Sequence, residues 1–115
     1  YSAKLGAVAK VPEMMAGARS VWAQYTIVTD RRDALAKACR EAGVPTAIHY
    51  TSPLHRLTPY RDCPTAPGGL PGAEWLSERV ISLPMHGYLS EEGQDVVIDT
   101  VLGALGSGAG SVAAE

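Results

Sequence analysis

The side chains best suited to chemistry are three histidines and two cysteines. Histidine and cysteine are types that zinc accepts as ligands, and the candidate ligands are His49, His55, Cys63 and His86. Their spacings match no compact zinc motif, and Cys39 and Cys63 form no CxxC pair. Cys63 lies in a proline-rich loop, where no helix N-terminus is expected to activate its thiol. We therefore predict two reduced cysteines, no metal site and no Ser-His-Asp or Cys-His hydrolase.

Length and composition exclude several classes of protein. The 115 residues, of which 46% are hydrophobic and 19% charged, suffice for one modest core. The net charge of -2 and the scattered lysines and arginines provide no basic surface for nucleic acid. No apolar run approaches the roughly 20 residues that cross a bilayer, and the N-terminus lacks the pattern of a signal peptide. We therefore predict one cytoplasmic domain with neither nucleic acid nor membrane as a partner.

A first strand and a first helix are expected before the histidines. Residues 21–28 are rich in β-branched and aromatic residues, which predicts a strand with Trp22 and Tyr25 on opposite faces. A helix should follow, with Asp30 capping its N-terminus and Gly43 ending it. The strand and the helix together would form one side of a small core.

The remaining elements should place the histidines at a sheet edge. The alternating segment 46–50 predicts a strand that pairs with the first one and leaves His49 and Tyr50 at its end. Prolines then exclude long regular structure until residue 69. After that the pattern predicts a helix over 70–80, a strand over 81–83 and a helix over 90–105. Ser90 can cap the last helix. Its buried stripe should consist of Val97, Ile98, Val101, Leu102 and Leu105.

This order of elements predicts an α+β fold. It consists of a small, mostly antiparallel sheet of about three strands with helices packed on one face. Residues 1–19 read as a connector from a missing large domain and 20–105 as the folded small domain. Residues 106–115 are a Gly/Ser/Ala tail that we expect to be flexible.

Six short motifs occur in one order. They are SVWAQYT at 20–26, RD at 32–33, GVPTAIHY at 43–50, PLH at 53–55, LPGAE at 70–74 and SLPMH at 82–86. Together they resemble the C-terminal small domain of the DegT/DnrJ/EryC1/StrS family of fold-type I aminotransferases, which depend on pyridoxal phosphate (PLP). The first and third motifs look most like the branch that aminates a UDP-linked 3-keto hexuronate derivative.

The resemblance implies a homodimeric parent enzyme that transfers an amino group from glutamate to a nucleotide-linked keto sugar, for cell-surface polysaccharide or antibiotic sugars. In this family a lysine of the large domain holds PLP, and that domain has no counterpart here. The three lysines present are Lys4, Lys10 and Lys37. Lys37 is predicted on the polar side of its helix, as a solvated surface lysine. We therefore expect PLP in the parent, none bound to this chain, and no catalytic residue within it.

The same resemblance indicates candidate substrate-binding residues. The family directs the loop after the second strand toward the sugar, and the matching residues are His49, Tyr50 and His55. Imidazole and phenol groups can hydrogen-bond hydroxyl, carboxylate or acetamido groups without adding a fixed charge. We predict that these three residues select substrate and transfer no proton. Alternatively, His49 and Tyr50 only end a strand and His55 packs under the proline-rich loop. His86 is predicted to be a structural turn residue.

A second class of function stays open. A small α+β domain of this size can also exist alone, as a binding or interaction module that has no catalysis and associates with sugar nucleotides or with itself. The chain begins with Tyr1 rather than with Met, which favours the reading as part of a longer enzyme.

Overall fold

Two strands and four α-helices make up the regular structure of residues 1–106, the part of the chain that this computed structural model describes. In chain order they are α1 (Ser2–Leu5), β1 (Tyr25–Val28), α2 (Arg32–Glu41), α3 (Pro71–Ser77), β2 (Val80–Leu83) and α4 (Glu91–Gly106), with two short 3-10 helices, η1 (Leu54–Arg56) and η2 (Thr58–Tyr60), before α3. The predicted flexible tail lies outside the described residues from position 107 on. No helix within 1–106 is both long and apolar enough to cross a membrane.

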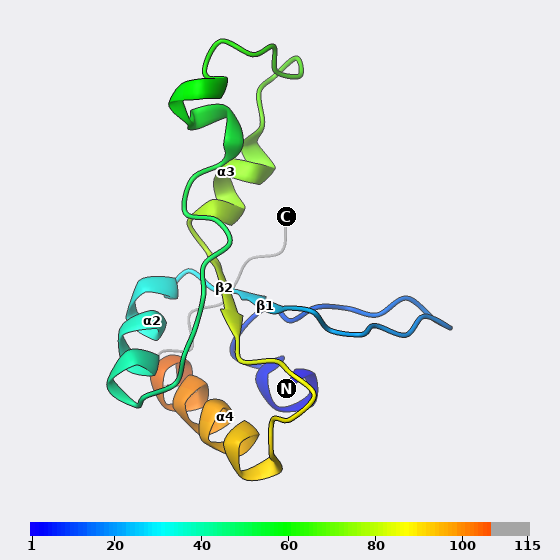
Figure 1. Ribbon diagram of the computed structural model, residues 1–115, viewed down its shortest axis with the longest axis vertical. Coiled ribbons are helices and arrows are strands. Elements are labelled where there is room, and N and C mark those ends of the chain that lie inside the picture. The colour runs from blue at the N-terminus through cyan, green and yellow to red at the C-terminus, as the bar shows by residue number, and fades with distance from the viewer. Residues whose placement is uncertain (107–115) are drawn as a thin grey trace.

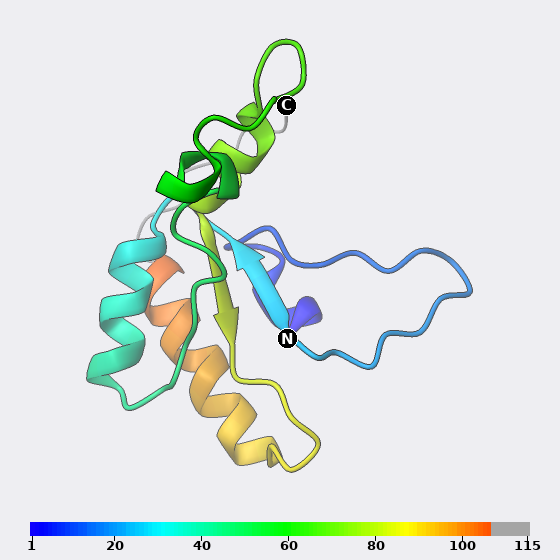
Figure 2. The ribbon, with the colours of Figure 1, turned by 45° about the horizontal axis from the view of Figure 1, so that its top comes forward.

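The sheet is a single antiparallel pair. Tyr25 of β1 lies opposite Leu83 of β2, and Val28 lies opposite Val80. Both strands are runs of β-branched, aliphatic and aromatic residues, which pack well on a pleated surface. Helices α2 and α4 pack against each other on one side of the sheet (Figures 1 and 2). The predicted α+β class, with a small antiparallel sheet and helices on one face, is confirmed.

The predicted strand over 46–50 is wrong in both its extent and its partner. Only Ala47 joins the sheet: its N–H donates to the Ser82 carbonyl over 3.1 Å, and the Ser82 N–H donates back over 2.7 Å. Ala47 therefore borders β2 and not β1, whose outer edge pairs with Lys10 at Val28. β2 is thus the central strand, and all four of its residues are buried.

The hydrophobic core lies between the sheet and the helices. Its fully buried side chains include Leu5 of α1, Ile27 of β1 and Leu35 of α2. The predicted stripe of α4 is confirmed, with four residues buried and Leu102 packed at the edge of the core. The predicted cap of α4 is also confirmed, because the Ser90 hydroxyl accepts the Gly93 N–H over 3.1 Å.

The predicted start of α2 is wrong, whereas its predicted end is confirmed. Asp30 does not cap the helix: its carboxylate accepts the Nε–H of Arg79 over 2.6 Å instead, and α2 begins two residues later. Gly43 ends α2 as predicted, with a φ of 70°. The Gly43 N–H donates to Arg40 and the Val44 N–H to Cys39, which is the Schellman arrangement that closes helix C-termini.

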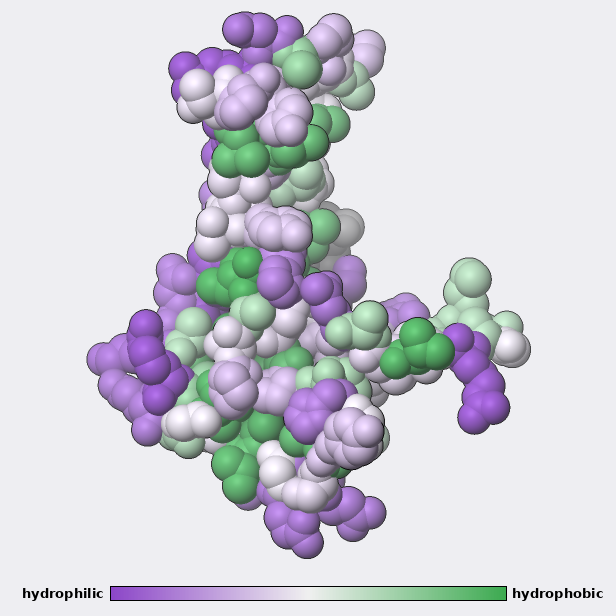
Figure 3. Space-filling view, in the orientation of Figure 1, coloured by the Kyte–Doolittle hydropathy of each residue, from purple (hydrophilic) through white to green (hydrophobic). Residues whose placement is uncertain are grey.

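Two segments project from this body (Figures 1 and 2). The lobe, residues 49–77, contains η1, η2 and α3 and extends along the longest dimension of the molecule, 47 Å. The arm, residues 11–24, leaves the body beside β1 as an irregular excursion. No residue from 49 to 76 is buried, so the lobe has no hydrophobic core of its own. Figure 3 shows apolar surface on the lobe, where Leu54, Leu57, Leu70, Trp75 and Leu76 are exposed.

Candidate functional site

His49 and Tyr50 lie where the chain leaves the sheet and enters the lobe. Their ring centroids are 5.4 Å apart, in an edge-to-face arrangement. Tyr50 is 74% exposed, and His49 is exposed as well. Within residues 1–106 neither side chain has a hydrogen-bond partner, so the phenol and the imidazole are available to a ligand. The backbone pairing of Ala47 with Ser82 fixes the point from which this pair extends.

His55 has a different environment from His49 and Tyr50. Its Nε2 lies 3.0 Å from Oε1 of Glu74 in α3, and its side chain is only 18% exposed. Arg56 contacts the same carboxylate through Nε, 3.3 Å from Oε1, and Nη2, 3.0 Å from Oε2. The hydrogen bond from His55 and the charge of Arg56 hold the pKa of Glu74 below its ordinary value. We call Glu74, His55 and Arg56 the clamp, since they join η1 to α3.

Glu74 is a residue that sequence reasoning passed over. It occurs in the LPGAE motif but received no role, because an acidic residue near the start of a helix is ordinary helix chemistry. Its actual partners lie 18 and 19 positions earlier in the sequence. Neither residue type nor spacing in the sequence pointed to these partners.

Two arginines fix the base of the lobe to the body. Arg32, the first residue of α2, donates from Nη1 to the Ser77 carbonyl at the end of α3 over 3.2 Å. Arg79 binds Asp30 and donates to the Trp75 carbonyl over 3.0 Å, with its guanidinium 4.8 Å from the Trp75 ring centroid. Helix α3 is therefore anchored to the body at its C-terminal end.

The other aromatic and imidazole residues have structural positions. Trp22 does not lie on a strand: β1 begins at Tyr25, Trp22 has a φ of 48°, and the two rings lie 5.2 Å apart. The prediction that they occupy opposite faces is therefore wrong, because the strand is too short to include Trp22. His86 lies in a turn, as predicted, where its Nδ1 accepts the Tyr88 N–H over 3.3 Å.

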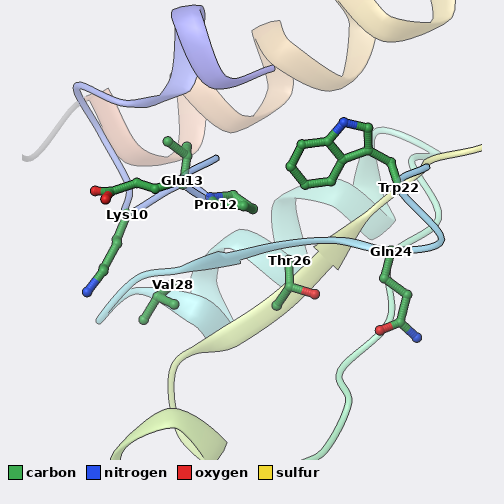
Figure 4. Close-up of a pocket in the computed structure, with 8 residues that line it drawn as sticks. Lys10, Pro12, Glu13, Trp22, Gln24, Thr26 and Val28 are labelled. Atoms are coloured by element: carbon green, nitrogen blue, oxygen red, sulfur yellow. The ribbon is translucent and has the colours of Figure 1, made fainter. Parts of the chain in front are cut away.

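A groove of about 540 Å³ follows the outer edge of β1 (Figure 4). Its walls include Lys10, Trp22, Gln24 and Thr26, which combine a cation, an indole face and neutral polar groups.

Comparison with known proteins identifies the family. The model of the DegT/DnrJ/EryC1/StrS aminotransferase family matches residues 1–102. The chain belongs to this family. The resemblance inferred from the six motifs is confirmed, and it also covers residues 1–19. In agreement with that, Leu5 and Ala9 belong to the core cluster.

Individual relatives support the assignment. The erythromycin biosynthesis sensory transduction protein EryC1 of Saccharopolyspora erythraea is 40% identical over 79% of this chain and 25% of its own length. The UDP-2-acetamido-2-deoxy-3-oxo-D-glucuronate aminotransferase of Pseudomonas aeruginosa is 41% identical over 61% of this chain and 19% of its own length. A crystal structure of a DegT/DnrJ/EryC1/StrS aminotransferase from Brucella abortus superposes with a TM-score of 0.88 at 48% identity, covering 91% of this chain and 28% of that one. The chain spans about a quarter of the length of these relatives.

The family depends on PLP, so we tested whether residues 1–106 fit that cofactor. A lysine that reacts with a carbonyl compound needs a desolvated or otherwise activated amine. Lys4 pairs with Asp95 at 3.2 Å and Lys37 with Glu41 at 3.9 Å, all four side chains being well exposed. Lys10 is exposed at the rim of the groove. None of these three lysines therefore fits the role of the residue that holds PLP.

Residues 1–106 were also compared with the requirements of a metal site. In this part of the chain no three His, Cys, Asp or Glu side chains come together in a way that could hold a metal ion. The imidazole nearest to a carboxylate is His55, and the clamp uses it to bind Glu74.

Proposed function

We propose that this chain is the sugar-facing C-terminal portion of a longer PLP-dependent aminotransferase. The parent would transfer an amino group from glutamate to a nucleotide-linked keto sugar, whose carbonyl oxygen is replaced by the amino group while glutamate becomes 2-oxoglutarate. The observation that carries this proposal is the match of residues 1–102 to an aminotransferase family whose members are about three times as long as this chain.

His49 and Tyr50 are proposed as the residues of this portion that bind the sugar. Both are exposed and without protein hydrogen-bond partners in residues 1–106, and they follow directly on the backbone anchor at Ala47. A phenol and an imidazole can each donate or accept, which suits hydroxyl and acetamido groups. That His55 also contacts the sugar stays a prediction. Its Nε2 faces Glu74, so such a contact would use the other ring nitrogen.

The rest of the parent is proposed to supply PLP and its lysine, because no lysine of residues 1–106 fits that role. Exposed apolar side chains on the lobe offer a surface on which the missing large domain can pack. We propose a cytoplasmic homodimer as the working assembly. The nucleotide sugar and glutamate would be its small-molecule partners.

The acceptor that we would assay first is a UDP-linked 3-keto hexuronate. The Trp-Ala-Gln-Tyr-Thr and Ile-His-Tyr motifs favour it, as does the 41% identity to the Pseudomonas aeruginosa enzyme named for such a substrate. Other relatives are named for dTDP-linked amino sugars, so dTDP-linked keto sugars form the comparison set.

Product analysis on the full-length parent tests this function. The purified enzyme is incubated with glutamate and each keto sugar, and mass spectrometry measures the aminated sugar and 2-oxoglutarate. We expect equal amounts of both products and a preference for the UDP-linked 3-keto hexuronate. An enzyme that contains PLP but aminates none of the nucleotide-linked keto sugars would contradict the proposal.

A further inference from the structure

Tyr50 lies on a segment that is held at both of its ends. At the near end, two backbone hydrogen bonds join Ala47 to Ser82 of β2. At the far end, His55 and Arg56 are bound by the carboxylate of Glu74. Between these points neither His49 nor Tyr50 has a hydrogen bond within the described residues. Their position therefore depends on the two anchors.

The far anchor is polar, and it lies in a lobe without a buried core. No residue from 49 to 76 is buried, so η1 is not held in place by a core. Glu74 makes three contacts across the gap between η1 and α3: one with His55 and two with Arg56. Charge-assisted hydrogen bonds of this kind are shorter and stronger than neutral ones, and a two-point contact with a guanidinium also fixes direction.

Helix α3 provides a fixed support for this anchor. The Ser77 carbonyl accepts a hydrogen bond from Arg32, and Arg79 ties the end of α3 to Asp30. A series of contacts thus joins the body to α3, and Glu74 joins α3 to η1. Tyr50 lies four residues before η1 in the chain. Without Glu74, the segment from 48 to 57 would be held at the Ala47 end only.

We propose that Glu74 is a positioning residue for the sugar-binding pair. It does not touch the sugar; it holds His55 and Arg56 so that His49 and Tyr50 are presented in one arrangement. The inference has two parts. The structural side, that Glu74 anchors residues 48–57, rests on the contacts alone. The substrate side, that this anchoring affects sugar binding, rests on the proposed function.

Hydrogen–deuterium exchange on the full-length parent tests the structural side. The variant is Glu74→Gln, and the matched control is Glu78→Gln, which removes a carboxylate at the end of the same helix that pairs with Arg79 and not with η1. We expect exchange in peptides covering 48–57 to rise about 10-fold in Glu74→Gln and to stay unchanged in Glu78→Gln. Unchanged exchange in Glu74→Gln would overturn the proposal whatever the enzyme's activity.

Steady-state kinetics test the substrate side. In Glu74→Gln we expect the KM for the keto sugar to rise about 10-fold, because loss of preorganisation weakens binding, while the KM for glutamate stays unchanged. If Glu74 only stabilised the fold, its substitution would change the KM for the keto sugar and the KM for glutamate together, or would change neither. Combining Glu74→Gln with Tyr50→Phe should raise the sugar KM by less than the product of the single effects, since both act on one contact.

Each outcome has a consequence. Faster exchange with an unchanged sugar KM would overturn the positioning role while leaving the proposed function intact. A wild-type parent that aminates no keto sugar would overturn the proposed function, and the exchange result would still decide whether Glu74 anchors the loop. If Glu74→Gln does not fold, Arg56→Gln, which removes the guanidinium from the same carboxylate, is measured in the same way with the same expectations.

Discussion

The body and the lobe of this molecule are held together by different forces. The body buries a continuous apolar cluster between β1, β2 and its helices, whereas residues 49–76 contain no buried side chain at all. The lobe depends instead on a few polar contacts, chiefly those of Glu74, Arg32 and Arg79. The comparison indicates that apolar burial holds the body together, while polar contacts hold the lobe, on which we propose the sugar-binding pair.

Core truncation should show the largest difference between the two regions. Leu35 is fully buried in α2, whereas Leu54 is exposed in η1. Leu35→Ala should lower the free energy of unfolding by about 2–5 kcal/mol, because it removes buried apolar contacts and leaves a cavity. Leu54→Ala should change it by less than about 0.5 kcal/mol. Urea unfolding measures both, and equal losses would contradict the division into body and lobe.

Gly43 tests the junction at which the body directs the chain toward the lobe. Its φ of 70° suits glycine, and no atom lies within 4 Å of where a Cβ would stand. Gly43→Ala should therefore cost about 1–2 kcal/mol through backbone strain alone. The control is Gly103→Ala in α4, where a Cβ also meets nothing and the helical backbone favours alanine by about 1 kcal/mol. Thermal unfolding should move in opposite directions for the two variants.

The same contrast explains what could be predicted from the sequence. The stripe on α4, the Ser90 cap and the Gly43 stop follow from local periodicity and end chemistry, and all three are confirmed. The partner of residues 46–50 was predicted wrongly, because strand order depends on contacts between segments far apart in the chain.

The polar contacts of the lobe were the least predictable part. Asp30 was expected to cap α2, but a guanidinium 49 positions away competes for its carboxylate. Glu74 has a similarly distant pair of partners. Neither residue type nor spacing distinguishes such an acid from a solvated one, so the clamp could only be found in the fold. His49 and Tyr50 were expected to end a strand over 46–50, but they follow a single bridging residue, Ala47, and lie in a turn.

Tyr50→Phe tests whether a side chain of the lobe can affect sugar binding without affecting stability. Because the Tyr50 hydroxyl has no partner within residues 1–106, its removal should leave the midpoint of urea unfolding unchanged. In the full-length enzyme it should raise the KM for the keto sugar by about 5-fold, which corresponds to one neutral hydrogen bond of about 1 kcal/mol. Tyr25→Phe is the contrasting control: its hydroxyl lies 2.6 Å from that of Ser2 inside the body, and its loss should lower stability. An unchanged sugar KM in Tyr50→Phe would remove Tyr50 from the proposed site.

The smallest expected effect is the response of the clamp to pH. The charged groups that face Glu74 are His55 and Arg56 of η1, and together they lower the pKa of its carboxyl group in the folded protein. A carboxyl group with a depressed folded pKa stabilises the fold above its unfolded pKa, and this contribution is lost as the pH falls through the folded value. The clamp should therefore be intact at neutral pH and weaken only in acid, below the ordinary titration range of a glutamate.

Carbon-13 NMR of the glutamate carboxyl groups measures this directly, with the urea-unfolded chain as the reference. His55→Gln and Arg56→Gln should each raise the pKa of Glu74, because the hydrogen bond from His55 and the charge of Arg56 both lower it. If Glu74 titrates at the same pH in the folded and the unfolded protein, its carboxylate is not held by η1, and the lobe lacks the anchor that distinguishes it from an unsupported loop.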